Sequence, residues 1–241
     1  MNSKIIISNN LEELSSNFTK ILMDGVNKSE GYFNLVLSGG STPKTVFDYL
    51  AANYKSIINW NKIRFFWGDE RCVPPDNNES NYFMTYDHLF SKIEIPEKNI
   101  FRISGESDPA QEAIRYTNLI LENIPLVNNL PSFDLIMLGL GEDGHTASIF
   151  PDRMDLINSN SICDVTVHPV IKQKRITLTG KVINNSKMVI FLISGSNKNK
   201  IVDLIINRKK GFEKLPAYYI NPESGELIWL LDYESGKGLS L

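Results

Sequence analysis

Residues 37–50 read LSGGSTPKTVFDYL, and this stretch decides the fold class. It continues an apolar run, Phe33–Ser38, that ends at two glycines. Ser41 and Thr42 come next, and Pro43 suits the first turn of a helix because its φ angle is already helical. A buried strand that passes through a glycine turn into a helix is the opening of a strand–helix–strand unit. The stretch therefore predicts an α/β protein.

The rest of the chain repeats this alternation. Short apolar runs without a polar–apolar alternation are typical of parallel strands covered on both faces. Such runs occur at Ile5–Ser8, Phe33–Ser38, Ile63–Trp67, Asp134–Leu138, Arg175–Thr179, Met188–Ser194 and Leu227–Leu231. Helical spacing of apolar residues lies between them, most clearly over 108–124 and 198–209, whereas residues 151–162 look most like a loop. We expect one domain over 1–241, a three-layer Rossmann-like fold whose mainly parallel sheet has helices on both faces.

The composition narrows the class of protein. The chain has 241 residues, 42% hydrophobic and 22% charged, with a formal net charge of −3. An acidic chain without a basic face is a poor match for nucleic acid, which is bound by neutralising phosphates. Cys72 and Cys163 lack metal-ligand spacing, so we expect no metal site. No signal peptide and no membrane-spanning run is visible, which predicts a cytoplasmic protein.

Ligands of such sheets bind beyond the carboxyl ends of the strands, so the residues after each strand are the candidates for function. After the first of these strands come Gly39, Gly40, Ser41 and Thr42. Glycines allow a close approach of the backbone, and the exposed N–H groups at a helix start attract an anion. We expect a phosphate here, although the Walker A pattern is absent. The spacing Ser41–Lys44 also leaves open a serine nucleophile with a lysine base.

A second strand end, 65–82, reads FFWGDERCVPPDNNESNY. Asp69, Glu70 and Arg71 follow an aromatic strand directly. A salt-bridged loop is one explanation, and a functional site is the one we favour.

A third strand end, 138–150, reads LGLGEDGHTASIF. Its glycines have the G-x-G-x-x-G spacing of a dinucleotide fingerprint, which requires a helix after the last glycine. Pro151 comes too soon for a long helix, and two carboxylates would stand beside the pyrophosphate. We therefore expect a turn that presents His145, a natural general base near neutral pH, beside Asp143. His88 and His168 are expected to be structural.

Two cations lie at the ends of later strands. Arg175 opens the run RITLT, and Lys198 follows FLISGSN. At ligand-facing positions in an acidic protein, this pair indicates an anion clamp.

Together these stretches resemble the 6-phosphogluconolactonase family. LSGGSTP, FFWGDERCVPP with ESNY, LGLGEDGHTASIFP, KRITLT and SGSNK occur in the family's order. The wider superfamily includes glucosamine-6-phosphate deaminase, whose pattern has tyrosine where this chain has Arg71. The deaminase also has a glutamate where Phe150 stands, so the resemblance favours the lactonase.

The resemblance implies hydrolysis of 6-phospho-D-glucono-1,5-lactone in the pentose phosphate pathway. His145 would activate water, with Asp69 or Asp143 orienting it, and Arg71 or a backbone N–H would stabilise the oxyanion. Arg175, Lys198 and residues 39–42 would hold the phosphate. It implies no metal or redox cofactor, a phosphosugar lactone as the partner, and a monomer or small homo-oligomer. A deaminase and a non-catalytic sugar-phosphate sensor stay as alternatives.

Overall fold

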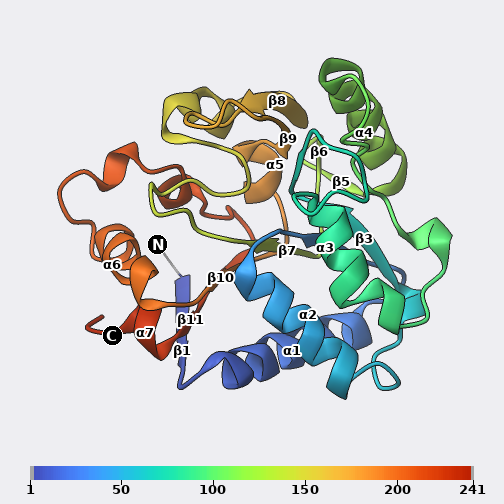
Figure 1. Ribbon diagram of the computed structural model, residues 1–241, viewed down its shortest axis with the longest axis horizontal. Helices are drawn as coiled ribbons and strands as arrows, with labels where there is room; N and C mark the ends of the chain where they lie inside the picture. Colours follow the sequence, from blue (N-terminus) through green and yellow to red (C-terminus); the bar gives the residue numbers. More distant parts are fainter. Residues whose placement is uncertain (1–2, 240–241) are drawn as a thin grey trace.

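The structure, a computed structural model, describes residues 3–239 and is built on a six-stranded parallel sheet (Figure 1). Its order is β1-β11-β10-β7-β2-β3, and all its neighbouring strands are parallel. The strands are β1 (Ser3–Ser8), β2 (Phe33–Leu37), β3 (Ile63–Trp67), β7 (Leu135–Leu138), β10 (Met188–Ile193) and β11 (Glu226–Asp232). All six were predicted as strands, because each contains a short, mainly apolar run.

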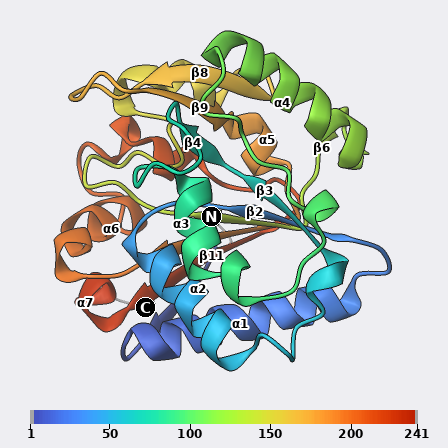
Figure 2. The ribbon, with the colours of Figure 1, turned by 45° about the vertical axis from the view of Figure 1, so that its right-hand side comes forward.

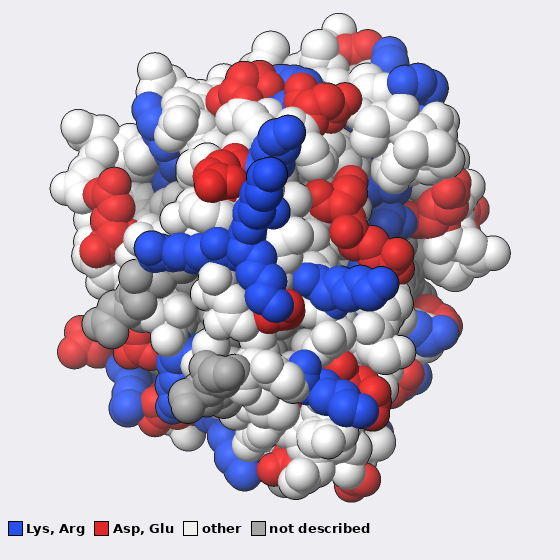
Figure 3. All heavy atoms as spheres, turned by 90° about the vertical axis from the view of Figure 1, so that its left-hand side faces the viewer, with Lys and Arg blue, Asp and Glu red and all other residues white. Residues whose placement is uncertain are grey.

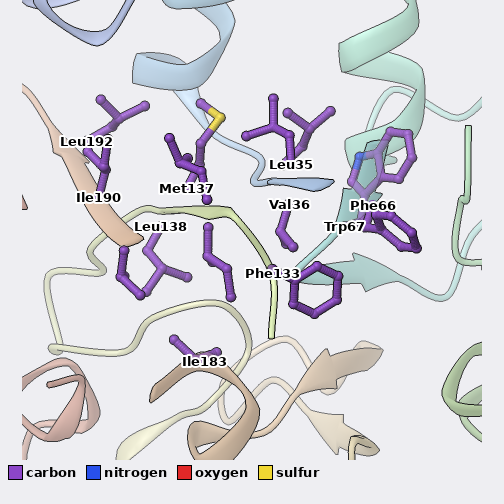
Figure 4. Close-up of a cluster of buried hydrophobic side chains, with 14 of the residues drawn as sticks. Leu35, Val36, Phe66, Trp67, Phe133, Met137, Leu138, Ile183, Ile190 and Leu192 are labelled. Atoms are coloured by element: carbon purple, nitrogen blue, oxygen red, sulfur yellow. The ribbon is translucent and has the colours of Figure 1, made fainter. Parts of the chain in front are cut away.

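Burial on both faces explains these runs. Every residue of β2 and of β7 is buried. Figure 4 shows Leu35 and Met137 pointing to one side of the sheet and Val36 and Leu138 to the other. Side chains alternate along a strand, so a strand covered on both faces is mainly apolar on both of them. The polar residue of β2, Asn34, is buried and donates a hydrogen bond to Asp134 Oδ2.

Helices cover the two faces of this sheet. They are α1 (Leu11–Lys28), α2 (Ser41–Asn53), α3 (Asn81–His88), α4 (Pro109–Asn123), α5 (Gly180–Asn184), α6 (Asn199–Ile206) and α7 (Tyr233–Gly236). Helices α1 and α2 lie below the sheet in Figures 1 and 2, and α4 and α5 lie above it. The predicted three-layer α/β architecture is confirmed. The helix predicted over 108–124 begins where Asp108 accepts hydrogen bonds from the N–H groups of Ala110 and Gln111.

A second, antiparallel sheet lies above the first, and the sequence analysis missed it. Its order is β4-β9-β8, formed by β4 (Asp69–Arg71), β9 (Lys174–Leu178) and β8 (Cys163–Val167). The run at Arg175–Thr179 was expected in the parallel sheet, and that placement is wrong. Apolar runs mark buried strands but carry no information about which sheet a strand joins. Helix α4 packs against β8 and β9 (Figure 2).

Residues 151–162 are more ordered than predicted. They contain a 3₁₀ helix, Pro151–Ile157, in which Leu156 and Ile157 are buried. The many polar residues of this stretch concealed its two core side chains. A short hairpin pairs β5 (Leu126–Val127) with β6 (Leu130–Pro131). Further short 3₁₀ helices lie at Trp60–Lys62, Phe90–Lys92, Glu97–Asn99, Ser196–Lys198, Phe212–Lys214 and Pro216–Tyr219.

The strand order places a crevice at one edge of the sheet. From β2 the chain continues to β3 on one side, whereas from β7 it continues to β10 on the other side. Adjacent strands whose connections leave in opposite directions form a topological switch point, where open α/β sheets bind ligands. The carboxyl ends of β2 and β7 are therefore the expected floor of a site.

Nearly all the buried apolar residues form one core cluster that includes residues of both the parallel and the antiparallel sheet. Within residues 3–239, no helix is both long enough and apolar enough to cross a membrane. On the face shown in Figure 3, Lys and Arg side chains gather near the centre with Asp and Glu side chains around them. This face therefore carries charges of both signs.

Candidate active site

A pocket of about 210 Å³ lies at the switch point. Residues of all four predicted strand ends line it. They are Ser38–Pro43 after β2; Asp69, Arg71 and Asn81 after β3; Gly139–Gly141, His145 and Ala147 after β7; and Arg175, Leu192 and Lys198 from β9 and β10.

The loop after β2 is shaped by Gly40, whose φ of 112° is unfavourable for other residues. No side chain caps helix α2, so the N–H groups of its first turn face the pocket without a side-chain partner. Thr42 Oγ1 lies 2.7 Å from Ser194 Oγ and ties this loop to the end of β10. Ser41 lines the pocket, but Lys44 is exposed and does not. The serine–lysine alternative therefore has no support in this geometry.

The loop after β7 is a tight turn, as predicted, and not a dinucleotide cradle. Gly141 N donates to His145 O over 2.8 Å, and Gly144 has a φ of 81°. No α-helix follows Gly144 before the 3₁₀ helix at Pro151. The helix start that a pyrophosphate requires is thus missing at this position.

The turn brings two side chains together. Asp143 Oδ1 lies 2.5 Å from His145 Nδ1 and also accepts the His145 N–H over 3.1 Å. A carboxylate on Nδ1 favours the tautomer whose Nε2 is free to accept a proton. Burial acts to raise the pKa of Asp143, but hydrogen bonding to His145 and the charge of His145 lower it overall. The Asp143–His145 pair occupies the space beside the Cα of Gly141, because a Cβ at residue 141 would lie 2.1 Å from His145 Nδ1.

Asp69, the other candidate for orienting His145, has different partners. It is 4% exposed and accepts a hydrogen bond from Ser148 Oγ over 2.6 Å. Asn81 Nδ2 donates to the Asp69 carbonyl over 2.8 Å and to Asp69 Oδ1 over 3.3 Å. Asp143, and not Asp69, therefore contacts the histidine.

Glu70 connects the charged cluster Asp69–Arg71 to the segment ESNY, residues 79–82. Its buried carboxylate accepts from the N–H groups of Asn81, Tyr82 and Arg71 and from Ser80 Oγ, at 2.7 to 2.9 Å. Burial raises the pKa of Glu70, and these hydrogen bonds oppose the rise. An anion at a helix N-terminus satisfies N–H groups that have no partner within the helix. Glu70 thus fixes the start of α3 beside the pocket.

Arg71 and Arg175 form a like-charged cross-strand pair, directly opposite in β4 and β9. Neither makes a salt bridge with a residue in the described part of the chain, and each has a buried Nε without a partner. Arg71 Nη1 donates to the Glu79 carbonyl. Arg175 is 8% exposed, and burial lowers its pKa although Asp69 opposes the effect. A buried cation without a charged partner, such as Arg175, is costly unless an anion joins it.

Lys198 ends the 3₁₀ helix Ser196–Lys198 and lines the same pocket. The turn before it is held by Asp232, whose carboxylate accepts the Gly195 N–H at 3.0 to 3.1 Å. Asn197 Nδ2 donates to Glu142 Oε1 over 2.6 Å, so this turn also contacts the His145 loop.

Phe150 lies beneath the site, fully buried. Its ring centroid is 4.9 Å from that of His145 and 5.0 Å from that of His168, and the Arg175 guanidinium lies 5.7 Å away. His168 is therefore closer to the site than the sequence indicated. The Nδ1 of His168 accepts backbone N–H groups of its own turn, which is a structural role. His88, as predicted, is structural and contacts Asp48 over 2.9 Å.

All the predicted site residues except Asp143 line the pocket, and Asp143 reaches it through His145. Three buried polar residues were missed: Asn81, Ser148 and Thr177, the last of which accepts the Ser148 N–H. Asn81 and Ser148 lie inside motifs already recognised, ESNY and DGHTAS. The signal was present, but short polar residues beside a site are usual in any loop.

Comparison with known proteins identifies the family of this chain. Residues 9–229 match the family model described as glucosamine-6-phosphate isomerases/6-phosphogluconolactonase. A 6-phosphogluconolactonase of Treponema pallidum is 36% identical over 89% of this chain and 89% of its own length. One of Haemophilus influenzae is 40% identical over 83% of this chain and 84% of its own.

A solved structure gives the same result. The crystal structure of 6-phosphogluconolactonase from Leishmania guyanensis superimposes with a TM-score of 0.88 at 26% identity, covering 100% of both chains. Sequence and structure together show that the chain belongs to the family of glucosamine-6-phosphate isomerases and 6-phosphogluconolactonases.

Proposed function

We propose that this protein hydrolyses 6-phospho-D-glucono-1,5-lactone to 6-phospho-D-gluconate, the lactone step of the pentose phosphate pathway. The observation that carries the proposal is the combination, in one pocket, of two unpaired arginines with an imidazole–carboxylate pair. The first suits an anionic substrate, and the second suits general-base catalysis. The relatives named 6-phosphogluconolactonase support the same reaction.

The phosphate is bound by the α2 N-terminus and by cations. The uncapped N–H groups after Gly40 offer backbone donors, and Arg175 and Lys198, which line the same pocket, provide positive charge. Arg175 is the stronger anchor, because its guanidinium is buried and already lacks a partner. Binding the phosphate dianion satisfies groups that are destabilising in the free protein.

His145 acts on water. Its Nε2 accepts a proton from a water molecule while the water oxygen bonds to C1 of the lactone. The carbonyl electrons move to oxygen, giving a tetrahedral intermediate with an oxyanion. When the carbonyl re-forms, the bond between C1 and the ring oxygen breaks, and Nε2–H protonates that oxygen. Asp143 stabilises the imidazolium that exists between the two transfers.

Arg71 stabilises the oxyanion. It lines the pocket, and its buried Nε lacks a partner and can donate to the oxyanion. The deaminase pattern has tyrosine at this position, and it has a glutamate where Phe150 is fully buried here. Phe150 has no proton to exchange during ring opening of an amino sugar, which makes the deaminase reaction the weaker candidate.

The proposal is tested with His145→Ala. Hydrolysis of the phosphorylated lactone, after subtraction of its spontaneous hydrolysis, should fall by roughly 10²–10⁴-fold. His88→Ala removes a histidine that contacts Asp48 outside the pocket, and it should leave the rate unchanged. Unphosphorylated gluconolactone should be a much poorer substrate of the unmodified protein. An unchanged rate in His145→Ala, or ammonia release from glucosamine 6-phosphate, would contradict the assignment.

Four further expectations stay predictions. They are a cytoplasmic location, no nucleic-acid partner, a monomer or small homo-oligomer, and one domain over residues 1–241. The single core cluster that spans both sheets supports the last of these.

A further inference from the structure

Asn81 is a buried residue of the pocket to which the mechanism above gives no role. It is 2% exposed, stands first in helix α3 and lines the pocket beside Asp69 and Gly39. Its main chain is fully used, because its N–H is bound by Glu70 and its carbonyl accepts Thr85 Oγ1 over 2.9 Å. The side-chain amide is therefore the part of Asn81 whose role the main-chain hydrogen bonds leave open.

The partners of this amide fix its orientation. Nδ2 faces two acceptors of Asp69, the carbonyl at 2.8 Å and Oδ1 at 3.3 Å. Turning the amide over would place Oδ1 against these oxygens, which is repulsive. The NH₂ group therefore points to Asp69, and Oδ1 points away from it.

Oδ1 receives no hydrogen bond from the described part of the chain. It occupies the space beside the Gly39 Cα, where a Cβ would come within 1.8 Å of it. This acceptor faces the open pocket, where water can donate to it in the free protein, so a ligand that displaces the water must supply a donor of its own. A phosphate dianion presents only acceptors, whereas a sugar hydroxyl has a proton to donate.

We propose that Asn81 is a specificity-determining residue, whose Oδ1 accepts a hydrogen bond from a hydroxyl of the lactone ring. The inference rests on the proposed function, because it takes the phosphosugar lactone as the ligand. Gly39 is the first residue of the turn proposed to bind the phosphate, and His145 marks the position of C1. Oδ1 therefore lies toward the phosphate end of the ring and binds the hydroxyl of C3 or C4, not that of C2.

The other side chains of the pocket agree with this assignment. Arg71, Arg175, Lys198 and His145 are donors or bases suited to the phosphate and the lactone group. Among the charged and amide side chains that line the pocket, Asp69 and Asn81 are the ones that present acceptor oxygens to hydroxyls. Asp69 and Asn81 are neighbours in the pocket, since Asn81 Nδ2 donates hydrogen bonds to Asp69.

The test compares Asn81→Ala with the unmodified protein on four substrates: the parent 6-phosphogluconolactone and its 2-deoxy, 3-deoxy and 4-deoxy analogues. The unmodified protein should lose about 10-fold in kcat/KM when the bound hydroxyl is missing. Asn81→Ala should lose the same factor on the parent lactone and show no further loss on the 3-deoxy or on the 4-deoxy analogue. The 2-deoxy analogue should keep the ratio it has with the unmodified protein.

A purely structural role gives a different pattern. If Asn81→Ala lowers kcat/KM by one common factor on all four substrates, the proposal is overturned, and it is equally overturned if discrimination is lost at C2 alone. Asn81→Ser keeps a small polar residue at the helix start and repeats the test if the alanine variant does not fold. Asn99→Ala is the matched control, because Asn99 is 1% exposed and donates to Asn61 O away from the pocket. No turnover of the parent lactone by the unmodified protein would refute the proposed function itself.

Discussion

Arg71 and Arg175 face each other across neighbouring antiparallel strands, with their charges unpaired by any side chain of residues 3–239. Like charges directly opposite in a sheet are destabilising. The protein keeps this arrangement at the wall of its pocket, where a phosphorylated substrate supplies the missing negative charge. At these two residues, the arrangement that favours binding of a phosphorylated substrate therefore lowers the stability of the ligand-free protein.

Arg175→Gln should accordingly raise the free energy of unfolding of the ligand-free protein, by about 1 kcal/mol. It should also weaken phosphate binding, so that inorganic phosphate raises the melting temperature of the variant less than that of the unmodified protein. Thermal denaturation with and without phosphate measures both effects. Lys174→Gln is the control, because it removes an exposed cation from the same strand and should change neither value. A variant that is less stable without ligand would contradict this account.

Asp143→Asn should lower kcat and leave KM almost unchanged. The asparagine can present an NH₂ group to His145 Nδ1, which favours the tautomer whose Nε2 carries the proton and cannot act as a base. Where an asparagine replaces the orienting carboxylate of a catalytic histidine, the loss reaches about 10⁴-fold. Steady-state kinetics measure it, and Asp69→Asn separates the two carboxylates. If Asp143→Asn and Asp69→Asn change the pH dependence of kcat equally, Asp143 is not the carboxylate that orients His145.

Gly141→Ala should inactivate the protein without unfolding it. The new Cβ would lie 2.1 Å from His145 Nδ1 and 2.5 Å from Asp143 Oδ1, so the pair must separate. We expect a loss of kcat at least as large as that of Asp143→Asn, with an unchanged circular dichroism spectrum. Gly31→Ala is the matched control, since a Cβ there meets nothing within 4 Å. Full activity in Gly141→Ala would mean that the Asp143–His145 contact is dispensable.

His168 should make the protein sensitive to acid. Burial lowers its pKa below the ordinary 6.5, and the charges of Arg175, His145 and Arg71 act in the same direction, opposed by Asp143. The unfolded chain therefore binds the proton more readily, and the stability falls as the pH drops from 6.5 through the folded-state pKa. Urea denaturation over this range should show a shallower pH dependence for His168→Asn. Parallel curves for the two proteins would rule out this contribution.

The parallel sheet could be predicted because its signal is local. Each of its strands is an apolar run, and the glycine turn before Pro43 shows that a helix follows. The antiparallel sheet has no such signal: β4 consists of Asp69, Glu70 and Arg71, three charged residues that pair with β9 only in the folded chain. The pairing of strands distant in sequence is decided by tertiary packing, which a pattern of residues does not reveal.

The same limit applies to the site. The positions of His145 and Lys198 followed from the rule that ligands bind at the carboxyl ends of strands. Arg175 lies near the start of β9 and was recognised as a cation beside a predicted strand. The choice between Asp69 and Asp143 did not follow, because both carboxylates come after a strand. What separates them is the Ser148 hydroxyl, 79 residues away from Asp69 along the chain. The acceptor on Asn81 was hidden for the same reason, since its orientation depends on Asp69.

The pairing of β4 with β9 also has a kinetic consequence. The pairing places Arg71 opposite Arg175, which is far away in the sequence. This side of the pocket therefore forms only after the long intervening segment has lost conformational entropy. Contacts of such large sequence separation form slowly and late. During refolding, helical signal should therefore return before enzymatic activity, and a chain still emerging from the ribosome stays inactive until residue 175 and the strand around it are available.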